Sequence, residues 1–126
     1  MHVLLIDDSR TMRRILASML KQMGCQTISE ADSGLAALEL LADATAGGVP
    51  DMVLVDWHMP GMSGVDFVEA VRAKPYDYRG VVMMVTTETE IDQIGRALAL
   101  GADEYLMKPF TQEVLAQKLE LLGFEV

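Results

Sequence analysis

Hydrophobic residues follow two different spacings along the chain. Short apolar runs such as residues 51–55 (DMVLV) are typical of strands buried on both faces, whereas residues 10–23 carry apolar side chains at helical spacing. The ranges expected to form strands are 2–6, 25–31, 51–55, 80–85 and 103–107. Helices are expected over 10–23, over a segment marked by Leu35, Leu38, Leu41 and Ala42 that ends near Gly47 and Gly48, over about 64–73 with Val65, Val68 and Val71 inward, over 90–100, and after Thr111 through Leu115, Leu119 and Leu122.

This alternation of strands and helices predicts the fold class. Parallel strands joined by helical crossovers through short loops give an α/β fold, here a doubly wound five-stranded parallel sheet with five helices on both faces. No internal repeat, linker or low-complexity segment divides residues 1–126, and 51% hydrophobic residues are ample for one core. We therefore expect a single domain.

Charge and composition exclude several classes of protein. The net charge is −9 and the basic residues are scattered, so direct binding to nucleic acid is not expected; Arg13 and Arg14 are assigned to the solvated face of the first helix. The single cysteine, Cys25, lies in a strand-like run and cannot form an internal disulfide, which favours a structural role in a reducing compartment. No apolar run matches a membrane span, and no signal peptide is evident, so we expect a cytoplasmic protein without membrane association.

Chemically specific residues follow four of the five expected strands. Asp7 and Asp8 follow the first strand, Asp56 the third, Thr86 the fourth and Lys108 the fifth. Capping of a helix N-terminus would explain the acidic pair alone, but not a third carboxylate, a hydroxyl and an ammonium at the same edge. Ligands of such sheets bind beyond the carboxyl ends of the strands, so these residues predict a binding site.

The charges of these side chains indicate which ligand they would hold. Three carboxylates at one edge raise each other's pKa unless a cation intervenes, and Mg²⁺ together with Lys108 would supply three positive charges against three negative ones. Mg²⁺ usually takes one or two carboxylates plus phosphate oxygens. A carboxylate can attack phosphorus, and phosphoryl transfer requires mainly positioning and charge neutralisation. These charges are compatible with magnesium-dependent phosphoryl transfer, which requires no general base.

Four motifs carry a resemblance to a known family. They are IDDS at 6–9, VDWHMPGMSG at 55–64, TT at 86–87 and KPF at 108–110, in this order. From about residue 2 to residue 123, the chain resembles the receiver domain of response regulators, and within that family it is most similar to the single-domain chemotaxis regulators. The resemblance implies the flavodoxin-like strand order 2-1-3-4-5.

The resemblance also implies roles for individual residues. Asp56 would accept a phosphoryl group from a histidine kinase, while Asp7, Asp8 and the main-chain carbonyl of His58 would help Asp56 to hold Mg²⁺. The residues that would transmit the change are Thr86, Lys108 and Tyr105. The protein would then be a signalling protein that assists only its own phosphoryl transfer and dephosphorylation.

The expected output is a change in affinity for a downstream protein. The fourth helix has an unbroken apolar run at 97–100, which exceeds the need of one buried face and indicates an exposed patch. The face formed by helix 4, strand 5 and helix 5 is the expected docking surface, as in similar receivers, on a protein expected to be monomeric.

Two departures from the family pattern concern the lifetime of the phosphorylated state. Thr87 stands where the family usually has a very small residue, and would narrow access to the site. His58, two residues past Asp56, can reach the mouth of the site and influence hydrolysis of the acyl phosphate.

Three alternative functions remain at this point. The chain could be the receiver of a larger DNA-binding transcriptional regulator, although its end at Val126, just past the last helix, favours a stand-alone protein. A phosphatase of the haloacid-dehalogenase type would need a second aspartate where His58 stands. An FMN carrier of the same fold would need hydrogen-bond donors in its first loop, where Asp7 and Asp8 would repel a phosphate.

Overall fold

The computed structural model of the protein describes residues 1–44 and 48–124. Its strands are β1 (His2–Ile6), β2 (Thr27–Ala31), β3 (Met52–Asp56), β4 (Val81–Thr86) and β5 (Glu104–Met107). Its helices are α1 (Arg10–Gln22), α2 (Gly34–Asp43), α3 (Gly64–Arg72), α4 (Ile94–Leu100) and α5 (Gln112–Leu121), with a 3₁₀ helix η2 (Glu88–Gln93) before α4. No helix within the described ranges is long and apolar enough to cross a membrane.

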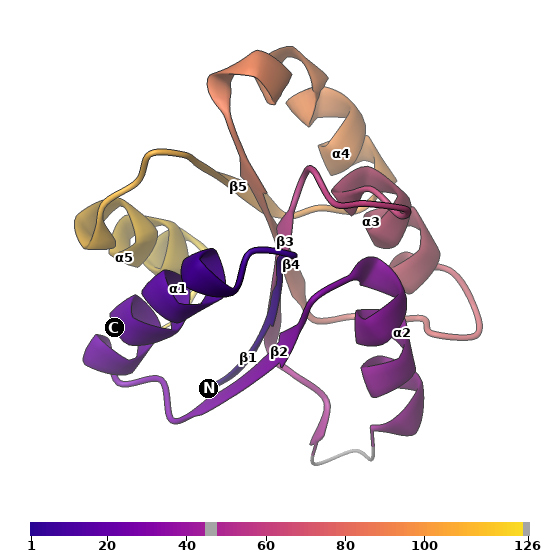
Figure 1. Ribbon diagram of the computed structural model, residues 1–126, viewed down its shortest axis with the longest axis horizontal. Coiled ribbons are helices and arrows are strands. Elements are labelled where there is room, and N and C mark those ends of the chain that lie inside the picture. The colour runs from indigo at the N-terminus through magenta and orange to yellow at the C-terminus, as the bar shows by residue number, and fades with distance from the viewer. Residues whose placement is uncertain (45–47, 125–126) are drawn as a thin grey trace.

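The five strands form one parallel sheet in the order β2-β1-β3-β4-β5. Figure 1 shows α1 and α5 on one side of the sheet and α2, α3 and α4 on the other. The doubly wound fold and the strand order implied by the family resemblance are therefore confirmed. Because β1 and β3 are neighbours at the centre, their carboxyl ends lie side by side.

Alternate residues of each strand supply two separate hydrophobic clusters. In β1, Val3 and Leu5 pack in the cluster that includes Leu16 of α1 and Leu115 of α5. The intervening residues of β1 belong to the cluster formed with α2, α3 and α4. All five residues of β3 are buried, as its continuous apolar sequence predicts for a strand covered on both faces.

Two boundaries near β2 and α2 differ from the sequence prediction. β2 begins at Thr27, so Cys25 is not part of the strand but is buried in the segment between α1 and β2, with its thiol 3.4 Å from the carbonyl oxygen of Met1. The helix α2 ends at Asp43, where Ala44 takes an extended conformation, and not near Gly48; Gly47 lies outside the described residues.

The buried face of α2 also differs from the predicted stripe. Ala37 and Leu38 are buried, whereas Leu35 is 63% exposed. Ala42, another residue of the predicted stripe, is exposed. The sequence GLAALELLAD is apolar on more than one side, so its spacing does not determine which side faces the sheet.

The predicted helix 90–100 is only partly α-helical. Its first part belongs to η2, and α4 spans Ile94–Leu100. The Glu90 side chain accepts a hydrogen bond from the Thr87 N–H at 3.3 Å, and the Glu90 N–H donates to the Thr87 carbonyl at 3.1 Å. These local bonds accompany a tight three-residue turn in this segment.

Candidate functional site

The carboxyl ends of four neighbouring strands bring the predicted residues to one edge of the sheet. Asp7 and Asp8 follow β1, and Asp56 is the last residue of β3. Carboxylate oxygens of these three residues lie within 4.8 Å of one another. Thr86 ends β4, and Lys108 follows β5 directly. The fold therefore gathers side chains that are far apart in the sequence.

The backbone of Trp57, directly after Asp56, is held by hydrogen bonds to β4 and to the start of α3. The N–H of Trp57 donates to the carbonyl of Val85 in β4 at 2.9 Å, and the N–H of Gly64 donates to the carbonyl of Trp57 at 2.9 Å. A side chain at position 64 would clash with the carbonyl oxygen of Asp56. Glycine here allows the first turn of α3 to pack directly against the strand end.

Lys108 forms an ion pair with Asp56. Its Nζ lies 3.2 Å from Asp56 Oδ1, and the side chains of Lys108 and Asp56 are 25% and 11% exposed. The Lys108 N–H donates to the carbonyl of Thr86 at 2.7 Å. The lysine thus connects the ends of β3, β4 and β5, and it partly neutralises the predicted phosphoacceptor.

Asp7 is a buried carboxylate with an unused oxygen. It is 2% exposed; its Oδ1 accepts a hydrogen bond from the Ser9 N–H at 2.8 Å, and its Oδ2 is buried without a hydrogen-bond partner among the described residues. Burial raises the pKa of Asp7, and repulsion from Asp56 and Asp8 adds to this, while Ser9 and Lys108 act in the opposite direction. A buried oxygen of this kind is costly unless it has a partner.

The pKa of Asp56 is raised in the same direction as that of Asp7. Burial raises its pKa above the usual range despite the attraction and hydrogen bond of Lys108. A divalent cation that prefers oxygen ligands would supply the missing charge, and Asp7, Asp8 and Asp56 offer the carboxylates that Mg²⁺ prefers. The donor set therefore fits the predicted metal; the main-chain carbonyl of His58 stays a predicted ligand.

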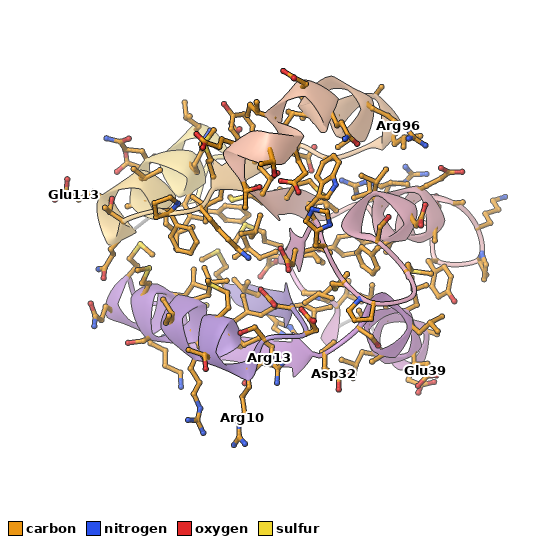
Figure 2. The ribbon with its side chains drawn as sticks, turned by 45° about the horizontal axis from the view of Figure 1, so that its top comes forward. Arg10, Arg13, Asp32, Glu39, Arg96 and Glu113 are labelled. Atoms are coloured by element: carbon orange, nitrogen blue, oxygen red, sulfur yellow. The ribbon has the colours of Figure 1, made fainter. Side chains whose placement is uncertain are left out.

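Arg13 has a role that the sequence analysis missed. Instead of extending into solvent, its Nη1 donates to the carbonyl of Asp7 at 2.6 Å and its Nε donates to Glu30 at 2.9 Å. Figure 2 shows the contrast with Arg10, which projects outward from α1. An arginine in the first turn of a helix that follows two acids was the available signal.

Glu90 is a second residue that the sequence analysis missed. It is 5% exposed, and its Oε2 accepts hydrogen bonds from the N–H and hydroxyl of Thr87 and from the Thr89 hydroxyl. Its Oε1 contacts Nε2 of His58. The Thr87 hydroxyl, followed by Thr89 and His58, lowers the pKa of Glu90 to about 2 against the effect of burial. A glutamate four residues after Thr86 was the only signal.

Two of the residues predicted to transmit the change, Thr86 and Tyr105, contact other groups in this structure. The hydroxyl of Thr86, which is buried, donates to the carbonyl of Thr87 at 3.3 Å. The half-buried ring of Tyr105 has Lys118 Nζ 4.1 Å from its centroid, and Lys118 pairs with Glu104 at 3.0 Å.

Comparison with known proteins identifies the family. The family pattern of the response regulator receiver domain matches residues 3–120. The chain belongs to this family. The chemotaxis protein CheY of Pseudomonas aeruginosa is 42% identical over 120 residues, which cover 95% of this chain and 94% of that protein. Chemotaxis protein CheY1 of Helicobacter pylori is 40% identical over 122 residues, covering 97% and 96%.

Solved receiver structures agree with the fold and differ in size. The chemotaxis response regulator CheY4 of Vibrio cholerae is 32% identical with a TM-score of 0.83, covering 96% of this chain and 97% of that one. A probable two-component system response regulator/GGDEF domain protein is 26% identical with a TM-score of 0.84, but this chain covers only 48% of it. The receiver is therefore a CheY-like signalling domain of two-component systems, and not a member of a classical enzyme family.

Proposed function

We propose that this receiver accepts a phosphoryl group from a histidine kinase on Asp56 in a magnesium-dependent reaction. Phosphorylation then changes its affinity for a partner protein in chemotaxis or motility signalling. One observation carries the proposal: Asp7, Asp8 and Asp56 meet at one sheet edge beside Lys108, and Asp7 retains a buried oxygen without a partner among the described residues. The likeness to chemotaxis proteins supports the pathway.

The reaction needs little from the protein beyond charge and position. A carboxylate oxygen of Asp56 attacks the phosphorus, the bond between phosphorus and the donor's imidazole nitrogen breaks, and an acyl phosphate forms. Asp7, Asp8, Asp56 and the His58 carbonyl would hold Mg²⁺, which supplies positive charge to the phosphoryl oxygens when bound. Lys108 neutralises Asp56 before the reaction and a phosphoryl oxygen afterwards.

Modification by a small phosphodonor tests the proposal. Acetyl phosphate should label the protein at Asp56 only when Mg²⁺ is present, and hydroxylamine should release the label because it cleaves acyl phosphates. Asp56→Asn should remove the label, whereas Asp43→Asn, which changes an exposed carboxylate on α2, should retain it. Equal labelling of Asp56→Asn with the same lability would contradict the assignment.

The proposed output passes through Thr86 and Tyr105. When a phosphoryl group occupies Asp56, the Thr86 hydroxyl leaves the Thr87 carbonyl and bonds to the phosphoryl oxygens. The Tyr105 ring then moves from its contact with Lys118 into the vacated space. The partner docks on α4, β5 and α5, where Leu98 is 43% exposed and Val114 is 38% exposed.

Beryllofluoride, a mimic of the phosphoryl group, tests this output. It should raise the affinity for the partner by about 5–150-fold, equivalent to ~1–3 kcal/mol of coupling, and Tyr105→Ala should reduce that gain. Equal gains in both proteins would eliminate Tyr105 as a relay. Chemical-shift changes confined to the α1 and α2 sides would eliminate the docking face.

A second candidate function is that of a receiver within a larger regulator. The GGDEF domain protein shows that a closely similar fold occurs as about half of a longer chain. A larger regulator of this kind with a DNA-binding output domain is the alternative, and such an output would contradict a role exercised by direct binding to a motility protein. The family match gives no support to a haloacid-dehalogenase phosphatase, and His58, where that class needs an aspartate, is bound to Glu90.

A further inference from the structure

Side chains link two loops at the rim of the candidate site. The ring of His58, in the loop between β3 and α3, contacts Oε1 of Glu90 in η2. The other oxygen of Glu90 accepts hydrogen bonds from Thr87 and from the Thr89 hydroxyl, the latter at 2.9 Å. The Glu90 side chain is 7% exposed, whereas that of His58 is 74% exposed. Glu90 is therefore the anchored member of the link.

The position of this link follows from the register of the sheet. Asp56 lies opposite Val85 across the β3–β4 pair, so the two loops leave the sheet from adjacent points. His58 is two residues past Asp56, and Glu90 is four residues past Thr86. The contact between them therefore joins the two loops that leave the sheet next to the phosphoacceptor.

We propose that Glu90 is a positioning residue that holds the His58 ring at this rim, where the ring hinders water from reaching a phosphoryl group on Asp56. Glu90 thereby lengthens the life of the phosphorylated form. This inference rests on the proposed phosphorylation of Asp56. In the hydrolysis, the oxygen of water attacks the phosphorus and the bond from phosphorus to the Asp56 oxygen breaks. Free carboxylate and inorganic phosphate result, with the two hydrogens of water on the phosphate or passed to solvent.

Because Glu90 is itself anchored, it can hold the His58 ring in one position. An exposed histidine side chain without a partner samples several rotamers, so it does not hold one position at the rim. The carboxylate of Glu90 receives three hydrogen bonds from Thr87 and Thr89, so its second oxygen has a fixed direction. Exclusion of water from a reactive intermediate suppresses its hydrolysis.

Decay of the phosphorylated protein tests the proposal. The parent and its variants are phosphorylated with acetyl phosphate and Mg²⁺, the donor is removed, and released inorganic phosphate is followed. Glu90→Ala should decay about tenfold faster, the factor that a barrier change of about 1.4 kcal/mol produces. His58→Ala keeps the main-chain carbonyl and should decay equally fast, and the double variant should be no faster than either single one.

Two matched variants separate positioning from general damage. Glu90→Gln keeps an oxygen that can accept the His58 hydrogen bond, so it should decay close to the parent rate. Asp92→Asn removes an exposed carboxylate from the same 3₁₀ helix and should leave the decay unchanged. Beryllofluoride affinity, read from the fluorescence of the single tryptophan Trp57, should be equal in Glu90→Ala and the parent.

Three results would overturn the inference. Parent-like or slower decay of Glu90→Ala would show that the link does not hinder water. Fully additive effects of Glu90→Ala and His58→Ala would show that Glu90 does not act through the ring, and loss of beryllofluoride affinity in Glu90→Ala would assign Glu90 to the structure of the site. A parent that takes no phosphate on Asp56 would instead overturn the proposed function, and this inference with it.

Discussion

Charged side chains lie at both ends of the sheet, but only those at one end have their hydrogen bonds completed within the described part of the protein. At the amino end, Arg72 of α3 donates five hydrogen bonds of 2.7–3.0 Å, which reach the carbonyls of Tyr78, Gly80 and Gly101 and the carboxylate of Asp103. At the carboxyl end, Asp7 keeps a buried oxygen without a partner among the described residues. We call the amino end, with the fully bonded Arg72, the saturated end. The carboxyl end, with this oxygen of Asp7, is the incomplete end.

The saturated end joins the starts of three strands. Asp103 also accepts a hydrogen bond from the Val82 N–H at 2.8 Å, which connects it to β4. The hydroxyl of Tyr78 donates to the carbonyl of Pro50 before β3 at 2.7 Å, and its ring centroid lies 5.7 Å from the guanidinium carbon of Arg72. With the polar groups of Arg72, Asp103 and Tyr78 paired, these residues contribute stability and offer little to a ligand.

The difference between the ends indicates where a ligand belongs. Buried polar groups in folded proteins are normally paired, so an unpaired carboxylate oxygen is a cost that a bound cation would remove. Both ends contain buried or half-buried charges, and burial of a charge therefore does not by itself identify a functional site. The presence or absence of an internal partner distinguishes them.

The largest expected effect comes from breaking the saturated end. Arg72→Leu should lower the free energy of unfolding by about 2–4 kcal/mol, because it removes the hydrogen-bond donor of three carbonyls that are buried or half-buried. Urea denaturation measures this loss. Arg79→Leu, which removes an exposed arginine paired with Asp77, should cost less than about 1 kcal/mol. Similar losses in the two variants would show that the Arg72 bonds carry no special weight.

At the incomplete end, removal of a buried charge is expected to increase the stability of the metal-free protein. Asp7→Asn should raise the free energy of unfolding of the metal-free protein by about 1–2 kcal/mol at neutral pH, because it removes a buried charge without a counterion. Mg²⁺ should stabilise the parent by binding the folded state and should stabilise this variant less. Asp8→Asn changes an exposed side chain, so it should weaken metal binding without the gain in stability.

The pH dependence of this gain follows from the raised pKa of Asp7. Because burial raises this pKa above the ordinary value of 3.8, the folded protein binds more protons than the unfolded one between the two values. The stability of the parent should therefore fall relative to Asp7→Asn as pH rises through the window between the unfolded and the folded pKa. Denaturation at several pH values without metal measures the difference; a constant difference would contradict the role of ionisation.

The sequence predicted the fold, and the place where the candidate site residues gather, from local patterns. Continuous apolar runs such as that of β3 indicated strands buried on both sides, and the residues after each strand had to meet once the strands were parallel. Family resemblance implied the strand order, which the structure confirms. The assigned roles of Asp56, Thr86 and Tyr105 in signalling stay predictions, because they concern states of the protein other than this one.

The missed features all depend on partners distant in sequence or on competition between similar faces. Arg13 contacts Glu30 across two secondary-structure elements, and no local pattern encodes that pairing. Glu90 contacts His58 from another loop, and no local pattern encodes that contact. The prediction that Leu35 lies on the buried side of α2 was wrong. Several sides of that helix are apolar, and only packing against the sheet selects between them.

The smallest effect is expected for Arg13, whose charge is already paired at the incomplete end. A change at Arg13 tests whether its hydrogen bonds support the predicted metal site. Arg13 holds the carbonyl of Asp7 and pairs with Glu30, so Arg13→Gln should lower the free energy of unfolding by only about 0.5–1 kcal/mol. Its effect on Mg²⁺ affinity should be a loss of less than about tenfold, because it supports the main chain of a ligand and not the ligating carboxylate. Titration of Trp57 fluorescence with Mg²⁺ measures the affinity, and Arg14→Gln, at the exposed neighbouring position, is the control. Equal affinities in the two variants would show that Asp7 needs no support from Arg13, and that the incomplete end is held in place by the strands alone.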